Sequence, residues 1–183
     1  AKPTDLRRIG RVMVLAVVVL GSIYAVITLG IHFGQADAVS LDATTWAASA
    51  HAEEWEAITW LNGQPGQPNI VTAPGCWCNP VESTWPYRWT NAPSSFTGIP
   101  TLAGWSHEVG YRGQEAYETR VADVSTIYTG STAARTRLLD AYDVAFVYVG
   151  PNERALYGEV SFAGIDGLSI AFENGAVTIY AVE

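Results

Sequence analysis

The feature that most constrains this chain is an uninterrupted apolar stretch near its beginning. Residues 12–33 read VMVLAVVVLGSIYAVITLGIHF and contain no Asp, Glu, Lys or Arg. At a rise of about 1.5 Å per residue, a helix of this length crosses the hydrocarbon core of a bilayer. The alternative, a cleaved signal peptide, has a shorter apolar region. The stretch therefore predicts a permanent transmembrane helix, preceded by a basic flank over residues 1–11.

The charges are divided unevenly by this stretch. Lys2, Arg7, Arg8 and Arg11 precede it, whereas the chain after Gly30 contains six arginines, no lysine and seventeen acidic residues, a net charge of −11. Basic residues mark the cytoplasmic end of a membrane helix, so we expect a cytoplasmic N-terminus and an extracellular C-terminal domain. The acidic surface excludes nucleic acid as a partner, because phosphate binding depends on Lys and Arg. Such a surface is also typical of halophilic proteins, since high salt screens the carboxylates.

The pattern beyond the apolar stretch predicts a linker over residues 34–52 and one α/β domain over residues 53–183. In that domain, apolar residues recur at three-residue steps over residues 53–61, which indicates a helix. Residues 70–73 form a short apolar run that indicates a buried strand. The segment 76–113 is rich in Trp, Pro, Ser and Gly and has no sustained period, which is typical of a long loop that builds a surface or a site.

Two further helices are expected in the middle of the domain. Apolar residues within 117–128 recur at steps of four, three and four, which predicts a helix that Gly130 ends. A second helix is capped by Ser131 or Thr132. Its buried side is expected to contain Ala134, Leu138 and Ala141.

The remaining apolar runs predict the rest of a small, partly parallel sheet. Residues 144–149 are apolar without alternation, as expected of a central strand covered on both faces. The long helical crossover from residues 70–73 makes these two strands parallel. Residues 168–172 alternate, and Asn174-Gly175 supplies the positive φ angles of a tight turn before residues 177–182, so the chain ends in a β-hairpin. Ligands are expected beyond the carboxyl ends of the parallel strands.

The two cysteines, Cys76 and Cys78, are separated by one residue. A disulfide across that spacing is strained, and a metal site needs more ligands than the neighbouring sequence supplies. We therefore expect free thiols, with a redox or metal-binding pair as the alternative. No cofactor and no metal are predicted.

The group with the most chemistry is His107, Glu108 and Arg112. His and Glu exchange protons, and Arg binds a phosphate or a carboxylate with two parallel hydrogen bonds. These three residues and Trp105 are therefore candidate substrate-binding residues. The alternative is that Glu108 and Arg112 pair across one helical turn and brace the loop beside Trp105.

Four other candidates are more isolated. Arg88 lies among Trp and Tyr residues, and we expect it to stack on sugar rings or to bind a lipid phosphate. Alternatively, the neighbouring aromatic side chains pack on the sheet or at the bilayer surface. Ser95 and Thr97 offer hydroxyl groups that position a substrate. Glu153 follows the second parallel strand and binds ligand hydroxyls, or instead stabilises the start of a helix. No residue is proposed as catalytic, because no complete set of nucleophile, base and orienting acid is evident.

Six blocks of the chain carry a resemblance to a known family. They are EAITWLN (56–62), IVTAPG (70–75), SSFTGIPTLAGWSHEVGYRG (94–113), DVSTIYTG (123–130), VAFVYVGPNERALY (144–157) and FENGAVTIYAV (172–182). In this order they resemble multi-pass archaeal and Chloroflexus-type membrane proteins of unknown function that are named for a YYY motif in their membrane part. Residues 76–80 and 82–89 depart from that pattern.

The resemblance implies that residues 1–183 are the last transmembrane helix and C-terminal outer domain of a larger polytopic protein. That family is distantly similar to glycosyltransferases that use lipid-linked sugars, in which an acidic residue in an early outer loop assists transfer. The implied partners are the lipid bilayer, the other transmembrane helices and a polyprenyl-phosphate-linked sugar, with the catalytic acid outside this fragment. The alternative is a non-enzymatic assembly or adhesion module, or a transporter-associated domain.

Overall fold

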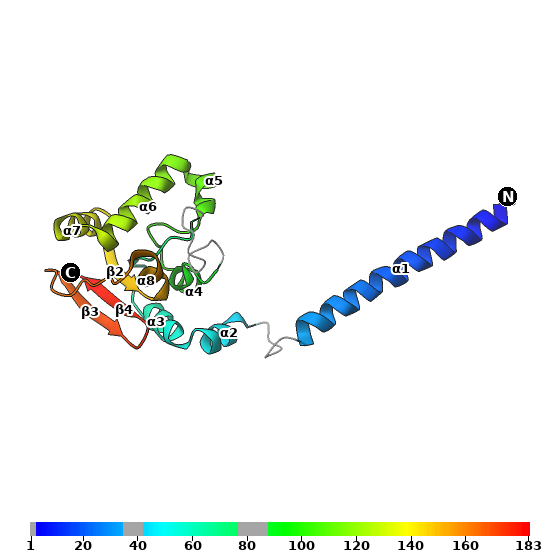
Figure 1. Cartoon of the computed structure of the whole chain (residues 1–183), viewed down its shortest axis with the longest axis horizontal. Helices are drawn as coiled ribbons and strands as arrows, with labels where there is room; N and C mark the ends of the chain where they lie inside the picture. The colour runs from blue at the N-terminus through cyan, green and yellow to red at the C-terminus, as the bar shows by residue number, and fades with distance from the viewer. Residues whose placement is uncertain (1–2, 35–41, 77–87) are drawn as a thin grey trace. The chain divides into compact units, whose positions relative to one another are not determined.

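A computed structural model describes residues 3–34, 42–76 and 88–183, which form two separate units, Ala1–Trp46 and Ala47–Glu183 (Figure 1). In the first unit, helix α1 spans Pro3–Gly34. Its residues Arg7–Gly34 are long and apolar enough to cross a membrane, and they are not buried by protein. Membrane association is therefore supported, and the predicted orientation stays a prediction.

A four-stranded mixed sheet forms the centre of the second unit, with the strand order β1-β2-β4-β3. The strands are β1 (Asn69–Val71), β2 (Val144–Val149), β3 (Leu168–Glu173) and β4 (Thr178–Val182). The pair β1 and β2 is parallel, β2 and β4 are antiparallel, and β3 with β4 forms the terminal hairpin. The predicted α/β class, the parallel pair and the hairpin are confirmed.

Helices cover both faces of this sheet, so β2 is buried on its two sides, as its unbroken apolar sequence predicts. On one face, apolar residues of α6 (Gln114–Thr129) and α7 (Thr132–Ala141) pack against Val147 and Val149. On the other face, α3 (Ala52–Asn62) packs against Tyr148 of β2. Figure 1 shows α6 and α7 on one side of β2 and α3 on the other. Two short helices flank these elements in the sequence. Helix α2 (Ala43–Ala50) precedes α3, and α8 (Pro151–Tyr157) follows β2.

The buried side of α7 agrees with the prediction at Leu138 and differs from it at the two alanines. Leu138 and Leu139 are buried, whereas Ala134 is half-buried and Ala141 is exposed. Two leucine side chains remove much more apolar area from water than an alanine does, so the helix turns its leucines toward the sheet. Ser131 is the N-cap, and its side chain accepts a hydrogen bond from the Ala134 N–H.

The hairpin turn also forms differently from the prediction, because neither Asn174 nor Gly175 has a positive φ. Instead, the Asn174 N–H donates to the Val177 carbonyl at 2.9 Å, and the Asn174 side-chain oxygen accepts from the Val177 N–H at 2.9 Å. The side-chain amide thus closes a four-residue turn. A Cβ at position 175 would meet the carboxylate of Glu53 on α3, so a larger residue there requires that exposed side chain to move.

The long aromatic segment contains three short helices, α4 (Ala92–Thr97), the 3-10 helix η2 (Ser106–Glu108) and α5 (Val109–Arg112). Between α4 and η2, the chain runs parallel to β1 and its extension, with bridges from Ile70 to Thr101 and from Gly75 to Trp105. The Gly75 N–H donates to the Gly104 carbonyl, and the Ser106 N–H donates to the Gly75 carbonyl. These bonds place Trp105 just beyond the carboxyl end of β1.

Candidate functional site

A pocket of about 400 Å³ lies between α4 and α5, and we call it the α4–α5 pocket. Five of the eight candidate residues line it: Ser95, Trp105, His107, Glu108 and Arg112. The other lining residues are Asn91, Ser94, Pro100, Thr101, Gly104 and Tyr111. The structure therefore brings together residues of three short helices, α4, η2 and α5, whose proximity in space the sequence did not predict. The volume of the α4–α5 pocket lies in the range typical of small-molecule sites.

Glu108 forms the rigid part of the wall of this pocket. Its Oε1 accepts a hydrogen bond from the Gly104 N–H at 2.6 Å, and its Oε2 lies 2.7 Å from Nε of Arg112. The pairing across one helical turn is therefore present. A Cβ on Gly104 would come within 2.5 Å of Glu108 Oε1, so only glycine allows this carboxylate to approach. Both carboxylate oxygens of Glu108 are engaged, which leaves it poorly placed to transfer a proton.

Trp105 is fixed by contacts on two sides. Its Nε1 donates to the Thr90 carbonyl at 3.2 Å. Its Cδ1 atom would lie 2.6 Å from a Cβ on Gly75, so the ring packs directly on the backbone of that glycine. The ring is half-buried and lines the pocket. A tryptophan held this way offers a rigid apolar surface to a ligand.

Asn91 is the site residue that sequence analysis missed. It is 5% exposed, has a left-handed backbone with φ of 56°, and precedes α4 as its N-cap. Its Oδ1 accepts from the Thr72 hydroxyl at 2.9 Å, and the Thr72 hydroxyl lies 2.9 Å from that of Thr101. Within residues 42–76 and 88–183, the Asn91 Nδ2 has no hydrogen-bond partner. The sequence signal was Asn before Ala92-Pro93, which is typical of a helix start.

Two of the other candidates lie outside this pocket. Arg88 is exposed, and the adjacent Trp89 stacks on His51 with ring centroids 3.9 Å apart. The neighbouring aromatic residues at 85 and 87 lie outside the described residues. Thr97 donates to the Pro93 carbonyl at 2.6 Å and accepts from the Ile99 N–H at 3.1 Å, so its hydroxyl serves the end of α4.

The third candidate outside the pocket is Glu153, whose carboxylate accepts hydrogen bonds from backbone N–H groups. It is 2% exposed, and its two carboxylate oxygens accept from the Ala73 N–H at 2.7 Å and from the Gly150 N–H at 2.9 Å. Burial raises the pKa of Glu153 to about 7, and these two hydrogen bonds act in the opposite direction. Glu153 therefore joins the ends of the two parallel strands at the start of α8 and presents no free oxygen to a ligand.

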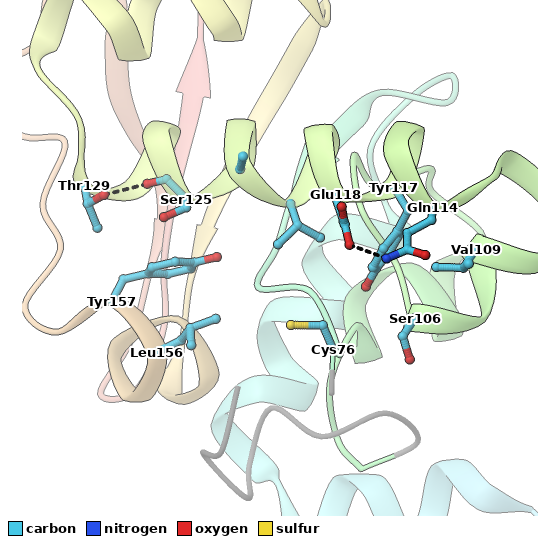
Figure 2. Close-up of a pocket in the computed structure, with 12 residues that line it drawn as sticks. Cys76, Ser106, Val109, Gln114, Tyr117, Glu118, Ser125, Thr129, Leu156 and Tyr157 are labelled. Atoms are coloured by element: carbon cyan, nitrogen blue, oxygen red, sulfur yellow. Dashed lines mark hydrogen bonds between the residues drawn. The ribbon is translucent and has the colours of Figure 1, made fainter. Parts of the chain in front are cut away.

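A larger groove of about 730 Å³ is lined mainly by α6 and by residues Leu156 and Tyr157 of α8 (Figure 2). Its walls combine apolar side chains with Gln114 and Glu118, which are joined by a 2.8 Å hydrogen bond. Tyr117, also in its wall, contacts the Gly104 carbonyl at 3.5 Å. Burial and then the charge of Glu108 raise the pKa of Tyr117 to about 12, so the phenol stays protonated at neutral pH.

The elements η2 and α5 separate this groove from the α4–α5 pocket. Ser106 and Val109 face the groove, whereas His107, Glu108 and Arg112 line the pocket. The two cavities therefore share one thin wall of seven residues, 106–112.

Cys76 lies in the wall of the larger groove and is disulfide-bonded, so the expectation of a free thiol there is wrong. Whether two thiols stay reduced depends on the compartment, which the spacing of cysteines in the sequence does not reveal. Cys78, the only other cysteine of the chain, lies outside the described residues. No group of three or more His, Cys, Asp or Glu side chains that could hold a metal ion occurs among residues 3–34, 42–76 and 88–183.

Comparison with known protein families and with curated proteins found no match for this chain. The resemblance to the YYY membrane proteins therefore stays a prediction. Among solved structures, the C-terminal globular domain of an oligosaccharyltransferase from Archaeoglobus fulgidus aligns with a TM-score of 0.44 at 10% sequence identity. The alignment covers 71% of this chain and 97% of that domain.

Proposed function

We propose that residues 47–183 are the extracytoplasmic part of a glycosyltransferase-like membrane protein and bind the head group of a lipid-linked sugar in the α4–α5 pocket. The observation that carries this proposal is the convergence of Ser95, Trp105, His107 and Arg112 in one pocket. A sugar ring presents hydroxyl groups at its edge and C–H groups on its faces. A pocket with hydroxyl, imidazole and indole side chains meets both kinds of surface.

The membrane context of the proposal is supported by three features. Helix α1 is long and apolar enough to span a bilayer. Arg7, Arg8 and Arg11 precede its apolar part, which favours a cytoplasmic N-terminus. The disulfide at Cys76 favours an oxidising compartment for the second unit.

The role of the pocket in this proposal is to position substrate. Glu108 has both oxygens engaged, by Gly104 and Arg112, and Glu153 is enclosed by backbone N–H groups. A carboxylate whose oxygens are already engaged, by hydrogen bonds or by an ion pair, is a poor general base. The family resemblance implies an acid that assists transfer in an early outer loop of the parent protein. The pocket then fixes the sugar while that acid acts.

Binding measurements test the proposal directly. The whole chain, in detergent micelles, is titrated with polyprenyl-phosphate sugars that carry glucose, mannose or N-acetylglucosamine. We expect saturable binding of at least one of them, weakened by the joint change of Ser95, His107 and Arg112 to Ala. The control is the joint change of Thr119, Thr136 and Arg137 to Ala, because all three are exposed and line neither the pocket nor the groove. Absence of binding by the unaltered chain contradicts the proposal and favours the assembly or adhesion alternative.

A further inference from the structure

The unpaired amide of Asn91 is the most informative polar group in the α4–α5 pocket. Asn91 is 5% exposed and is one of the residues that line the pocket. Its Oδ1 accepts a hydrogen bond from the Thr72 hydroxyl, and its Nδ2 has no hydrogen-bond partner in the described part of the chain. A buried donor without an acceptor is destabilising, so its presence in a pocket wall points to an acceptor on a ligand.

The backbone at Asn91 supports the same conclusion. Asn91 and Asp143 are the non-glycine residues with positive φ among those the structure describes. A left-handed conformation is tolerated by Asn better than by most residues, but it still carries strain, and strained positions gather at binding sites. Asn91 and Thr101 both line the pocket, and the Thr72 hydroxyl lies 2.9 Å from the Asn91 Oδ1 and 2.9 Å from the Thr101 hydroxyl.

The charge balance of the pocket disfavours a phosphate. Arg112 Nε lies 2.7 Å from Glu108 Oε2, so the positive charge in the wall is compensated by a carboxylate. The chain after Gly30 also has a net charge of −11, which repels anions over longer distances. A neutral ligand avoids this repulsion. The hydroxyls of Ser95 and Thr101 and the uncharged amide of Asn91 match the oxygens of such a ligand.

We propose that the α4–α5 pocket binds the uncharged sugar ring of its substrate, with the Asn91 Nδ2–H donating to a hydroxyl or acetamido oxygen of that ring. The sugar ring packs beside Trp105, and the phosphate stays outside the pocket. This inference rests on the proposed function, because it names which part of the lipid-linked sugar the pocket recognises.

The test compares polyprenyl-phosphate sugars with polyprenyl phosphate that carries no sugar, using the whole chain in detergent. The unaltered chain is expected to bind at least one sugar-bearing lipid about tenfold more tightly than polyprenyl phosphate, as expected for hydrogen bonds that only the sugar makes. Asn91→Gly keeps the left-handed backbone and removes the amide, and Asn91→Asp keeps the acceptor for Thr72 and removes the donor. Each change is expected to abolish most of that tenfold preference. Asn91→Gly is expected to leave binding of polyprenyl phosphate unchanged, whereas Asn91→Asp adds a negative charge and is expected to weaken the binding of both lipids.

Two controls make the result decisive. Asn62→Asp makes the same chemical change at an exposed position of α3 and is expected to keep the preference. Ser95→Ala alters an exposed residue of the same pocket, so it tests recognition of the sugar even if a change at Asn91 unfolds the domain. Ser95→Ala is expected to lower the preference for the sugar-bearing lipid over polyprenyl phosphate by about threefold.

The outcomes separate the two proposals. Equal affinity for polyprenyl phosphate with and without sugar overturns the recognition of the neutral ring and leaves the proposed function standing. If the Asn91 and Ser95 variants fold and still prefer the sugar-bearing lipid, the assigned role of this pocket in recognising the ring is also overturned, and the proposed function still stands. If none of these lipids binds, the proposed function itself fails, and the inference fails with it.

Discussion

The Glu153 carboxylate accepts a 2.7 Å hydrogen bond from the backbone N–H of Ala73, which lies 80 residues earlier in the chain. Its other oxygen accepts from the Gly150 N–H. One side chain thus joins the segment after β1 to the segment after β2. It holds together the carboxyl ends of the two parallel strands, beside which the α4–α5 pocket is built.

Because Glu153 is buried, the domain is expected to lose stability as the pH rises from about 5 to 7. Burial raises the pKa of Glu153 to about 7 from 4.5, so the folded state binds more protons than the unfolded state between these values. The free energy of unfolding therefore falls as the pH rises through this range and levels off above it, by about 3 kcal/mol for this group. Burial also raises the pKa of Glu54, which adds in the same direction.

Chemical unfolding followed by tryptophan fluorescence at pH 5, 6 and 7 measures this effect. Glu153→Gln removes the titrating group, so its free energy of unfolding should decline less over this range than that of the unaltered chain. The comparison uses slopes, because the Gln amide places an N–H group against a backbone N–H and lowers stability at every pH. Equal slopes for the two proteins contradict the prediction. Glu159→Gln, at an exposed position, serves as the control.

Tyr128→Phe is expected to lower the free energy of unfolding by about 1–3 kcal/mol. The Tyr128 hydroxyl is buried and lies 2.7 Å from the Tyr148 carbonyl oxygen and 3.0 Å from that of Val71. Phenylalanine leaves both buried acceptors without this donor. Tyr111→Phe makes the same change at a side chain that is 89% exposed, and its effect on denaturant unfolding should be negligible.

Gly75→Ala is expected to displace Trp105 and to destabilise the domain by about 1–3 kcal/mol. A Cβ at this position would lie 2.6 Å from Trp105 Cδ1 and 2.7 Å from Thr90 Oγ1. Gly110→Ala is the matched control, because a Cβ there meets nothing within 4 Å. Because the chain contains seven tryptophans, displacement of Trp105 is read from the change in folded-state fluorescence that Gly75→Ala causes and Gly110→Ala does not, and denaturant unfolding reports stability. A Gly75→Ala protein as stable as the control would show that this contact is unimportant.

Glu108→Gln is expected to strengthen the binding of polyprenyl phosphate by about two- to fivefold. The change removes the carboxylate that compensates Arg112, while the amide oxygen of Gln can still accept from the Gly104 N–H. Calorimetric titration of polyprenyl phosphate measures the affinity. Glu115→Gln removes one negative charge from an exposed position of α6 and shows how much of the gain comes from net charge alone. An equal gain from both changes would contradict a specific role for Glu108.

Local sequence patterns were sufficient for the sheet and for the helices that cover it. The apolar period predicted α6, and the unbroken apolar run over residues 144–149 predicted β2 at the centre of the sheet. Both features depend on residues close in sequence. The short helices α2, α4, η2 and α5 were not predicted. The block from Trp105 to Arg112 also indicated a site, because its charged and aromatic residues lie within two turns of helix.

Other parts of the site depended on contacts between distant segments. The role of Asn91 follows from Thr72, nineteen residues away, and from Thr101. Glu153 has the composition of a ligand-binding carboxylate, and only its distant partner Ala73 reveals that it is occupied. The turn at Asn174 was misjudged because the Asn174 side chain closes it, accepting from the Val177 N–H and donating to the carbonyl of the distant Glu53 on α3.

The strand order has a consequence for how this domain is made. Strand β4, at residues 178–182, lies between β2 and β3, although it follows both of them in the sequence. During folding, β2 and β3 therefore have no common neighbour until β4 inserts between them. Loss of residues 178–183 removes this interior strand and should leave a protein that quality-control proteases degrade.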